Sequence, residues 1–135
     1  MRRGTRHQAV NFALIGAIGF VIDGGVLTVL NSVFGLDLFR SRLVSFSIAV
    51  TVTWALNRWR TFADRKDRRA AREWGRYAIV NGLGALLNMA IFFWLIQHYA
   101  WAASQPILPL AIAATIALNF NFFASKYVAF WVPRS

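Results

Sequence analysis

The sequence lacks cysteine altogether and has only five acidic residues among its 135. The absence of cysteine excludes disulfides, thiol nucleophiles and thiolate metal ligands. The acids form no catalytic pair and no HExxH motif, and the two histidines, His7 and His98, fall at opposite ends of predicted membrane spans. We therefore expect no enzyme activity, no catalytic residue, no metal site and no cofactor.

Charged side chains are also missing from two long stretches. Residues 7–36 carry one formal charge, on Asp23, and residues 77–125 carry none. A helix needs about 20 apolar residues to cross the hydrocarbon core of a bilayer. The sequence therefore predicts an all-α membrane protein with four transmembrane helices, at 12–34, 43–59, 77–97 and 107–127.

Lys and Arg are abundant, and the formal net charge is +10. Eight of the fifteen lie in residues 58–76 and three in residues 2–6, whereas the first predicted outer loop has two and the second has none. By the positive-inside rule, the N-terminus, the central loop and the C-terminus face the cytoplasm. This distribution indicates membrane topology and attraction to anionic lipids, and it argues against nucleic-acid binding.

One pattern occurs twice along the chain, with the same spacings within each helix, at an offset of 65 residues for the first helix of each copy and 68 for the second. Gly16, Gly19 and Asp23 are matched in the second copy by Asn81, Gly84 and Asn88, and Ser47, Thr51, Trp54 and Arg58 are matched by Thr115, Asn119, Phe122 and Lys126. Each copy has two spans, so both copies enter the membrane in the same direction. We predict one domain, residues 1–135, built from two parallel repeats at 12–62 and 77–130, with a basic cytoplasmic linker at 63–76.

The segment 60–76 has two interpretations. In the first, the segment is an interfacial amphipathic helix whose Phe62 and Trp74 enter the headgroup region. In the second, it is a solvated charged loop. In both cases its three acids, Asp64, Asp67 and Glu73, are expected to be solvated among the arginines.

Asp23 is the sharpest candidate site residue, because a carboxylate is costly inside a bilayer. It shares a helix stripe with Gly16 and Gly19, and small residues such as these and Gly84 allow close helix packing. Counting depth at about 1.5 Å per residue places hydroxyls and amides near it. The predicted path for a sugar consists of Asp23, Thr51, Asn57, Asn88, Asn119 and Asn121. The alternative is that these groups only hydrogen-bond the helices to one another.

Arg58 and Lys126 occupy equivalent positions at the cytoplasmic ends of the second and fourth spans. Near a pseudo-twofold axis, two such cations are suited to hold a lipid phosphate, and Arg42 at the outer rim is suited to receive it after transfer. The alternative is that they are ordinary interfacial anchors beside aromatic residues.

These residues together resemble the GtrA family of small bacterial membrane proteins, over residues 9–131. The resemblance rests on Phe12-Ala-Leu-Ile-Gly16-x-x-Gly19 followed by Asp23, on Trp54-Ala-Leu-Asn57-Arg58-Trp59-Arg60-Thr61-Phe62, and on Asn121-Phe122-Phe123-x-Ser125-Lys126-Tyr127-Val128-x-Phe130. It implies a multi-pass protein of the bacterial cytoplasmic membrane that flips a polyprenyl-phosphate-linked monosaccharide for cell-envelope polysaccharide biosynthesis or glycosylation. The implied partners are that lipid, anionic lipids, a membrane glycosyltransferase and further copies of the chain, in a dimer or larger homo-oligomer.

Two other functions remain open from the sequence. The first is a non-transporting scaffold that recruits a glycosyltransferase through the basic loop. The second is a proton-coupled exporter similar to the small multidrug resistance transporters. The latter also have four spans and an acid in the first. The uncharged Asn88 at the position equivalent to Asp23 favours a polar anionic cargo over a drug cation.

Overall fold

The computed structural model describes residues 4–105 and 107–131, and this part of the chain is helical without strands. The elements in order are α1 (Thr5–Thr28), η1 (Val29–Val33), α2 (Leu38–Leu56), η2 (Asn57–Thr61), α3 (Ala70–His98), α4 (Ala100–Ser104), α5 (Ile107–Ala124) and η3 (Ser125–Ala129). The three η segments are π-helical turns, each of which extends the α-helix before it. The all-α prediction is confirmed.

Three helical segments within the described residues are long and apolar enough to cross a membrane: Thr5–Val33, Ala70–His98 and Ile107–Ala129. A membrane protein with several apolar helices is therefore confirmed. The helix α2 is not among them, since Arg40 and Arg42 lie in its first turns and lower its average hydropathy. The second predicted span, at 43–59, stays a prediction.

The helix α2 begins five residues earlier than predicted. The side chain of Asp37 caps it by accepting a hydrogen bond from the backbone N–H of Arg40, at 3.1 Å. An aspartate at this position satisfies a backbone donor that the first turn leaves unpaired. The two outer arginines are therefore helical residues and not part of the turn. Gly35, with a φ of 67°, reverses the chain before the cap.

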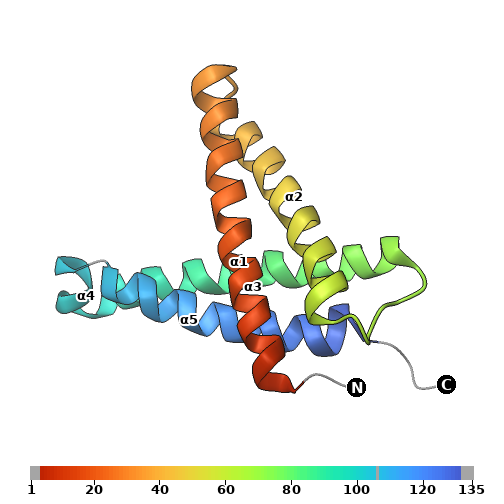
Figure 1. Ribbon diagram of the computed structural model, residues 1–135. Helices are drawn as coiled ribbons and strands as arrows, with labels where there is room; N and C mark the ends of the chain where they lie inside the picture. The colour runs from red at the N-terminus through yellow and green to blue at the C-terminus, as the bar shows by residue number, and fades with distance from the viewer. Residues whose placement is uncertain (1–3, 106, 132–135) are drawn as a thin grey trace.

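Two hairpins make up the fold, one of α1 with α2 and one of α3 with α5 (Figure 1). They bury equivalent positions. On α1 these are Gln8, Phe12, Ile15 and Gly19, and on α3 the equivalent residues are Glu73, Tyr77, Val80 and Gly84. The buried residues of α2 include Ser41, Ser45, Ala49 and Thr53. The first three are equivalent to Pro109, Ala113 and Ala117, which are buried on α5.

Small residues set the spacing inside each hairpin. Gly19 lies against the side chain of Thr53, and Gly84 lies against the side chain of Asn121, the equivalent of Thr53 in the second hairpin. A Cβ atom at either glycine would overlap its neighbour, so only glycine permits this approach. Gly16, predicted to pack in the same way, has no such neighbour within 4 Å, so its predicted packing role is wrong.

Aromatic side chains join the two hairpins near one end of each. The rings of Phe62 and Phe130 stack with centroids 4.8 Å apart, and Phe12 and Tyr77 pack against them edge-on or tilted. Phe62 is fully buried in this cluster, so its predicted place among lipid headgroups is wrong. Aromatic pairs of this kind contribute about 0.5–1.5 kcal/mol each beyond the area they bury.

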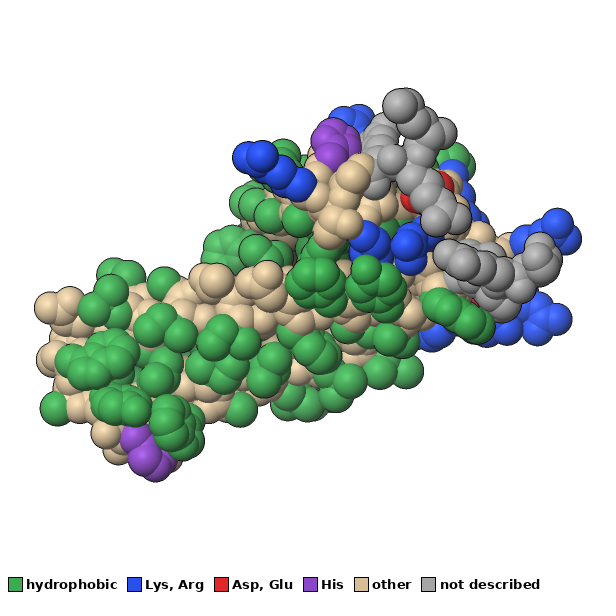
Figure 2. Space-filling view, turned by 90° about the horizontal axis from the view of Figure 1, so that it is seen from below, with side chains coloured by type: hydrophobic (Ala, Val, Ile, Leu, Met, Phe, Trp, Pro, Cys, Tyr) green, Lys and Arg blue, Asp and Glu red, His purple; other side chains and the backbone are tan. Residues whose placement is uncertain are grey.

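Away from the aromatic cluster the hairpins diverge, and in Figure 1 the α1–α2 pair stands across the α3–α5 pair. Figure 2 shows hydrophobic side chains along α3 and α5 and most of the visible Lys and Arg side chains towards the end opposite α4. At that end Lys126 donates to Thr5 Oγ1 at 3.0 Å, and Arg65 donates to the Lys126 carbonyl at 3.2 Å. The start of α1, the loop before α3 and the turn η3 therefore meet at one place.

Candidate functional site

A cleft of about 420 Å³ lies between the two hairpins. Most of its wall is apolar and comes from α1, α2, α3 and α5. The polar side chains that line it are Asp23, Thr53, Asn57, Tyr77, Asn81, Asn88 and Asn121. An apolar pocket with a few convergent polar groups is the usual form of a ligand site.

Asp23 is held on the cleft wall by Arg42. Arg42 Nη1 donates to Asp23 Oδ2 at 2.7 Å, and the Asp23 side chain is 16% exposed. The long arginine side chain reaches down from the start of α2, so the carboxylate is paired within its own hairpin. The predicted neighbours of Asp23, Thr51 and Thr53, lie further along α2, and Thr53 packs on Gly19 one turn before Asp23.

Two acceptor oxygens on the cleft wall have no donor. Asp23 Oδ1 and Asn121 Oδ1 are both buried, and neither has a hydrogen-bond partner. A buried acceptor without a donor costs about 1–3 kcal/mol, and such groups in native proteins commonly mark a site whose partner is absent. Asp23 and Asn121 therefore each place a buried acceptor without a donor in the wall of the cleft, and the Asn121 amide also packs on Gly84.

The inner part of the cleft is fully hydrogen-bonded. Asn57 Nδ2 donates to the Tyr77 hydroxyl at 3.0 Å, and Thr61 donates to Asn57 Oδ1 at 2.8 Å. Asn81 donates to the carbonyl of Tyr77 at 2.9 Å. The Asn57–Tyr77 bond joins η2 to α3, so these groups form the floor of the cleft close to the aromatic cluster.

Four of the six residues predicted for the sugar path line the cleft: Asp23, Asn57, Asn88 and Asn121. The other two lie outside it. Thr51 is exposed and accepts a hydrogen bond from Trp74 Nε1 at 3.1 Å, and Asn119 is exposed and donates to the Thr115 carbonyl of its own helix at 2.8 Å. Two residues along a helix is a rotation of about 200°, which separates Asn119 from Asn121.

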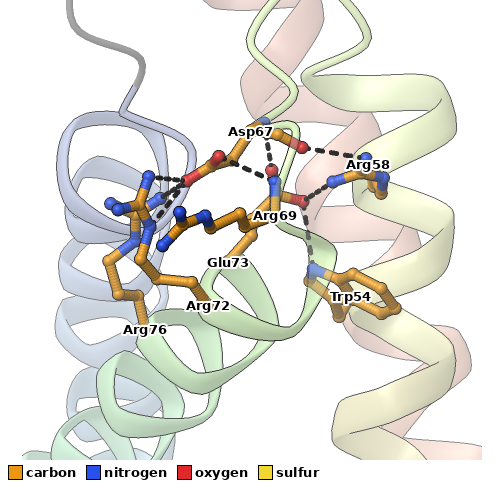
Figure 3. Close-up of polar contacts among 7 residues, drawn as sticks. All are labelled: Trp54, Arg58, Asp67, Arg69, Arg72, Glu73 and Arg76. Atoms are coloured by element: carbon orange, nitrogen blue, oxygen red, sulfur yellow. Dashed lines mark hydrogen bonds and ion pairs between the residues drawn. The ribbon is translucent and has the colours of Figure 1, made fainter.

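The first of the predicted phosphate-binding cations, Arg58, is bound to a carboxylate (Figure 3). Arg58 Nη1 donates to Glu73 Oε1 at 2.6 Å, and its Nη2 donates to the Asp67 carbonyl at 3.1 Å. Glu73 is fully buried and also accepts from Trp54 Nε1 at 3.1 Å and from the backbone N–H of Asp67 at 2.7 Å. The prediction that Glu73 is solvated is therefore wrong.

Asp67 forms the other half of this network. Its carboxylate accepts from the backbone N–H of Arg69 and from the side chains of Arg72 and Arg76, at 2.8–3.0 Å. The backbone hydrogen bond from Arg69, followed by the bond from Arg72, lowers the pKa of Asp67 below its ordinary value of 3.8. Asp67 is 7% exposed, so its predicted solvation is also wrong, whereas Asp64 is exposed as predicted.

Lys126 differs from Arg58 in its surroundings. It is 6% exposed, and its ammonium group bonds to Thr5 Oγ1 and lies near the rings of Phe122 and Tyr127, at 5.9 and 5.5 Å. No carboxylate among the described residues pairs with it. Arg42, the third predicted cation, is 56% exposed and is paired with Asp23.

A family model described as GtrA/DPMS, transmembrane domain matches residues 11–130. The chain belongs to this family. Comparison with proteins of curated function gives no match. The resemblance found in the sequence is therefore confirmed over nearly the whole length on which it was based.

Several polar groups of this GtrA/DPMS domain were missed by sequence reasoning. Tyr77 and Asn81 on the cleft floor were not assigned a place in the site, and Arg58 was assigned to a lipid phosphate and not to its pair with Glu73. One signal was present, since Asn81 is the repeat equivalent of Gly16 and an amide in a charge-free span is unusual. The partner of Glu73 was not visible, because it lies 15 residues away on another helix.

Proposed function

We propose that the chain translocates a polyprenyl-phosphate-linked monosaccharide across the bacterial cytoplasmic membrane, for envelope polysaccharide synthesis or glycosylation. In this proposal α2 also crosses the membrane, as the second of four spans, both chain ends and the linker face the cytoplasm, and the two hairpins are parallel repeats. Before transfer the sugar occupies the cleft and the phosphate lies at the basic end, and the phosphate then crosses together with the sugar. The prenyl tail remains in the lipid, so the protein has to enclose only the headgroup, and a homo-oligomer of small chains is large enough for this.

The observation that carries the proposal is the pair of unsatisfied acceptors on the cleft wall. Asp23 Oδ1 and Asn121 Oδ1 lack donors, and Asn88 adds a partly exposed amide to the same wall. A monosaccharide is a compact array of hydroxyl donors, which these acceptors match. Membership of the GtrA/DPMS family supports the same substrate class.

The test is translocation of a fluorescent or radiolabelled short-chain prenyl-phosphate sugar in vesicles that contain the purified full-length chain. Replacing Asn121 by Ala removes one acceptor from the cleft, and a lost hydrogen bond of about 1 kcal/mol corresponds to a roughly fivefold lower rate. Asp23→Asn removes the charged acceptor and should slow transfer at least as much.

Asn119→Ala is the matched control, because it deletes the same amide two residues away on the same helix but outside the cleft. Its rate should equal that of the wild type. Equal loss in Asn119→Ala and Asn121→Ala would show that the cleft does not carry the sugar.

One observation favours the scaffold as a second candidate. The carboxylates of Asp67 and Glu73 are buried and hydrogen-bonded within the protein, whereas Arg68 and Arg69 in the loop before α3 are exposed. A basic loop of this kind suits an acidic patch on a glycosyltransferase. Vesicles without any transferase that still show translocation would exclude a purely recruiting role. The exporter is disfavoured, since Asp23, the single acid of α1, is already paired with Arg42.

A further inference from the structure

The equivalent cations of the two hairpins, Arg58 and Lys126, have different hydrogen-bond partners. Arg58 of the first hairpin faces Glu73 of the second at 2.6 Å, and the preceding Asn57 has partners for both ends of its amide. Both residues are therefore fully satisfied inside the protein. This arrangement holds the loop before α3 against η2.

The residues at the equivalent positions in the other half of the repeat have fewer partners. In the repeat, Gln8 is the equivalent of Glu73, and Lys126 is the equivalent of Arg58. Where the first cation has a carboxylate opposite, the repeat has a neutral amide at the position equivalent to that carboxylate, and the Oε1 of this amide is buried without a donor. Ser125, the equivalent of Asn57, is fully buried and its hydroxyl has no partner either.

A buried ammonium without a counter-charge is costly, because it has lost its water without gaining an anion. Among the described residues, Lys126 is the cation that is buried in this state, since Arg42 and Arg58 are each paired. Thr5 accepts a hydrogen bond from the Lys126 ammonium group, and Ser125, which precedes Lys126 in the chain, carries a second hydroxyl. Gln8 lies one helical turn after Thr5, and rotating its amide would present N–H donors in place of the oxygen.

We propose that Lys126, with Thr5, Gln8 and Ser125, forms a single binding site for the phosphate of a prenyl lipid, and that Arg58 and Arg42 are structural cations. This inference rests on the proposed function and identifies which cation holds the headgroup. Apolar side chains surround the site: Tyr127, Val128 and Trp131 are each about half exposed, as a site for a phosphate on a hydrocarbon tail requires. One ammonium matches the single negative charge of a sugar phosphodiester.

The experiment measures binding to the full-length chain in detergent, with a short-chain prenyl phosphate, its sugar diester, and inorganic phosphate as the headgroup alone. Gln8→Glu places a carboxylate one helical turn after Thr5, the hydrogen-bond partner of Lys126, at the position equivalent to Glu73. It should raise the melting temperature and weaken binding of both lipids by roughly tenfold or more, the value of a charge-assisted contact. Lys126→Gln should weaken binding to a similar degree, and Lys126→Arg should retain it.

Arg68→Gln is the matched control, since it removes one positive charge from an exposed position at the same end of the molecule. Its affinity should remain within about twofold of the wild type. Binding that survives both Gln8→Glu and Lys126→Gln would overturn the site. Inorganic phosphate that binds as tightly as the lipids would overturn its assignment to a lipid headgroup.

The binding and transfer measurements distinguish failure of this phosphate site from failure of the proposed translocation. If the wild type binds the lipids, the two variants do not, and vesicles show no transfer, the phosphate site stands and translocation fails. If Lys126→Gln transfers the lipid-linked sugar at the wild-type rate, translocation stands and this site is wrong.

Discussion

Replacing Glu73 by Gln tests whether the loop before α3 is held by a buried ion pair. Gln has the shape of Glu, but one of its oxygens becomes an NH2 group. In the wild type both carboxylate oxygens accept: Oε1 from Arg58 and Trp54, and Oε2 from the backbone of Asp67. In the variant one of these donors must face another donor, and Arg58 loses its counter-charge.

The expected loss follows from the burial of the pair. Glu73 is fully buried, and the side chain of Arg58 is 16% exposed. Removing one partner of a buried pair costs about 3–5 kcal/mol, and the residual exposure of Arg58 places the expectation at the lower end, about 3 kcal/mol. Arg58→Gln should cost a similar amount. The double variant should lose about 1–3 kcal/mol less than the sum, because the second substitution removes an already unpaired group.

Reversible unfolding in mixed micelles, followed by helical circular dichroism against the mole fraction of a denaturing detergent, measures these differences. Asp64→Asn is the control, since Asp64 is an exposed acid in the same loop and should change stability by less than about 0.5 kcal/mol. A Glu73→Gln protein as stable as Asp64→Asn, or strictly additive effects of Glu73→Gln and Arg58→Gln, would refute the reasoning.

Two further predictions concern packing and pH. Gly19→Ala places a methyl group against Thr53, whose rotamer is held by its own hydrogen bonds, so it should destabilise the protein by about 1–3 kcal/mol in the same unfolding assay. The control Gly25→Ala has open space around the new methyl group and should be neutral or slightly stabilising. Equal effects of the two substitutions would exclude close packing at Gly19. The lowered pKa of Asp67 stabilises the fold above pH 3.8, and this contribution is lost as the pH falls below 3.8 through the folded value. The melting temperatures of wild type and Asp67→Asn should therefore converge on acidification, and a gap independent of pH would contradict the role of the Arg72 contact.

Much of the fold could be predicted from the sequence because the bilayer imposes a one-dimensional rule. Long apolar stretches without charge must be helical, since every backbone group has to be hydrogen-bonded within its own segment. The helical ends were less predictable. Capping by Asp37 and the extension of α3 back to Ala70 depend on local hydrogen bonds that hydropathy does not report.

The candidate site was predictable only in part. The constant offsets between the two copies identify equivalent residues, and four of six path residues do line the cleft. Thr51 and Asn119 do not, because depth along a helix says nothing about the direction in which a side chain points. A displacement of one residue turns it by about 100°.

By itself, then, the sequence determined helicity, membrane character and family membership, all of which follow from the order and type of residues. Only the tertiary structure decided which charges are neutralised. Glu73 and Gln8 are equivalent in the sequence, but the crossing of the hairpins brings Arg58 onto a carboxylate and leaves Lys126 without one. Electrostatic pairing depends on distances between side chains from different helices, and those distances exist only once the helices have packed.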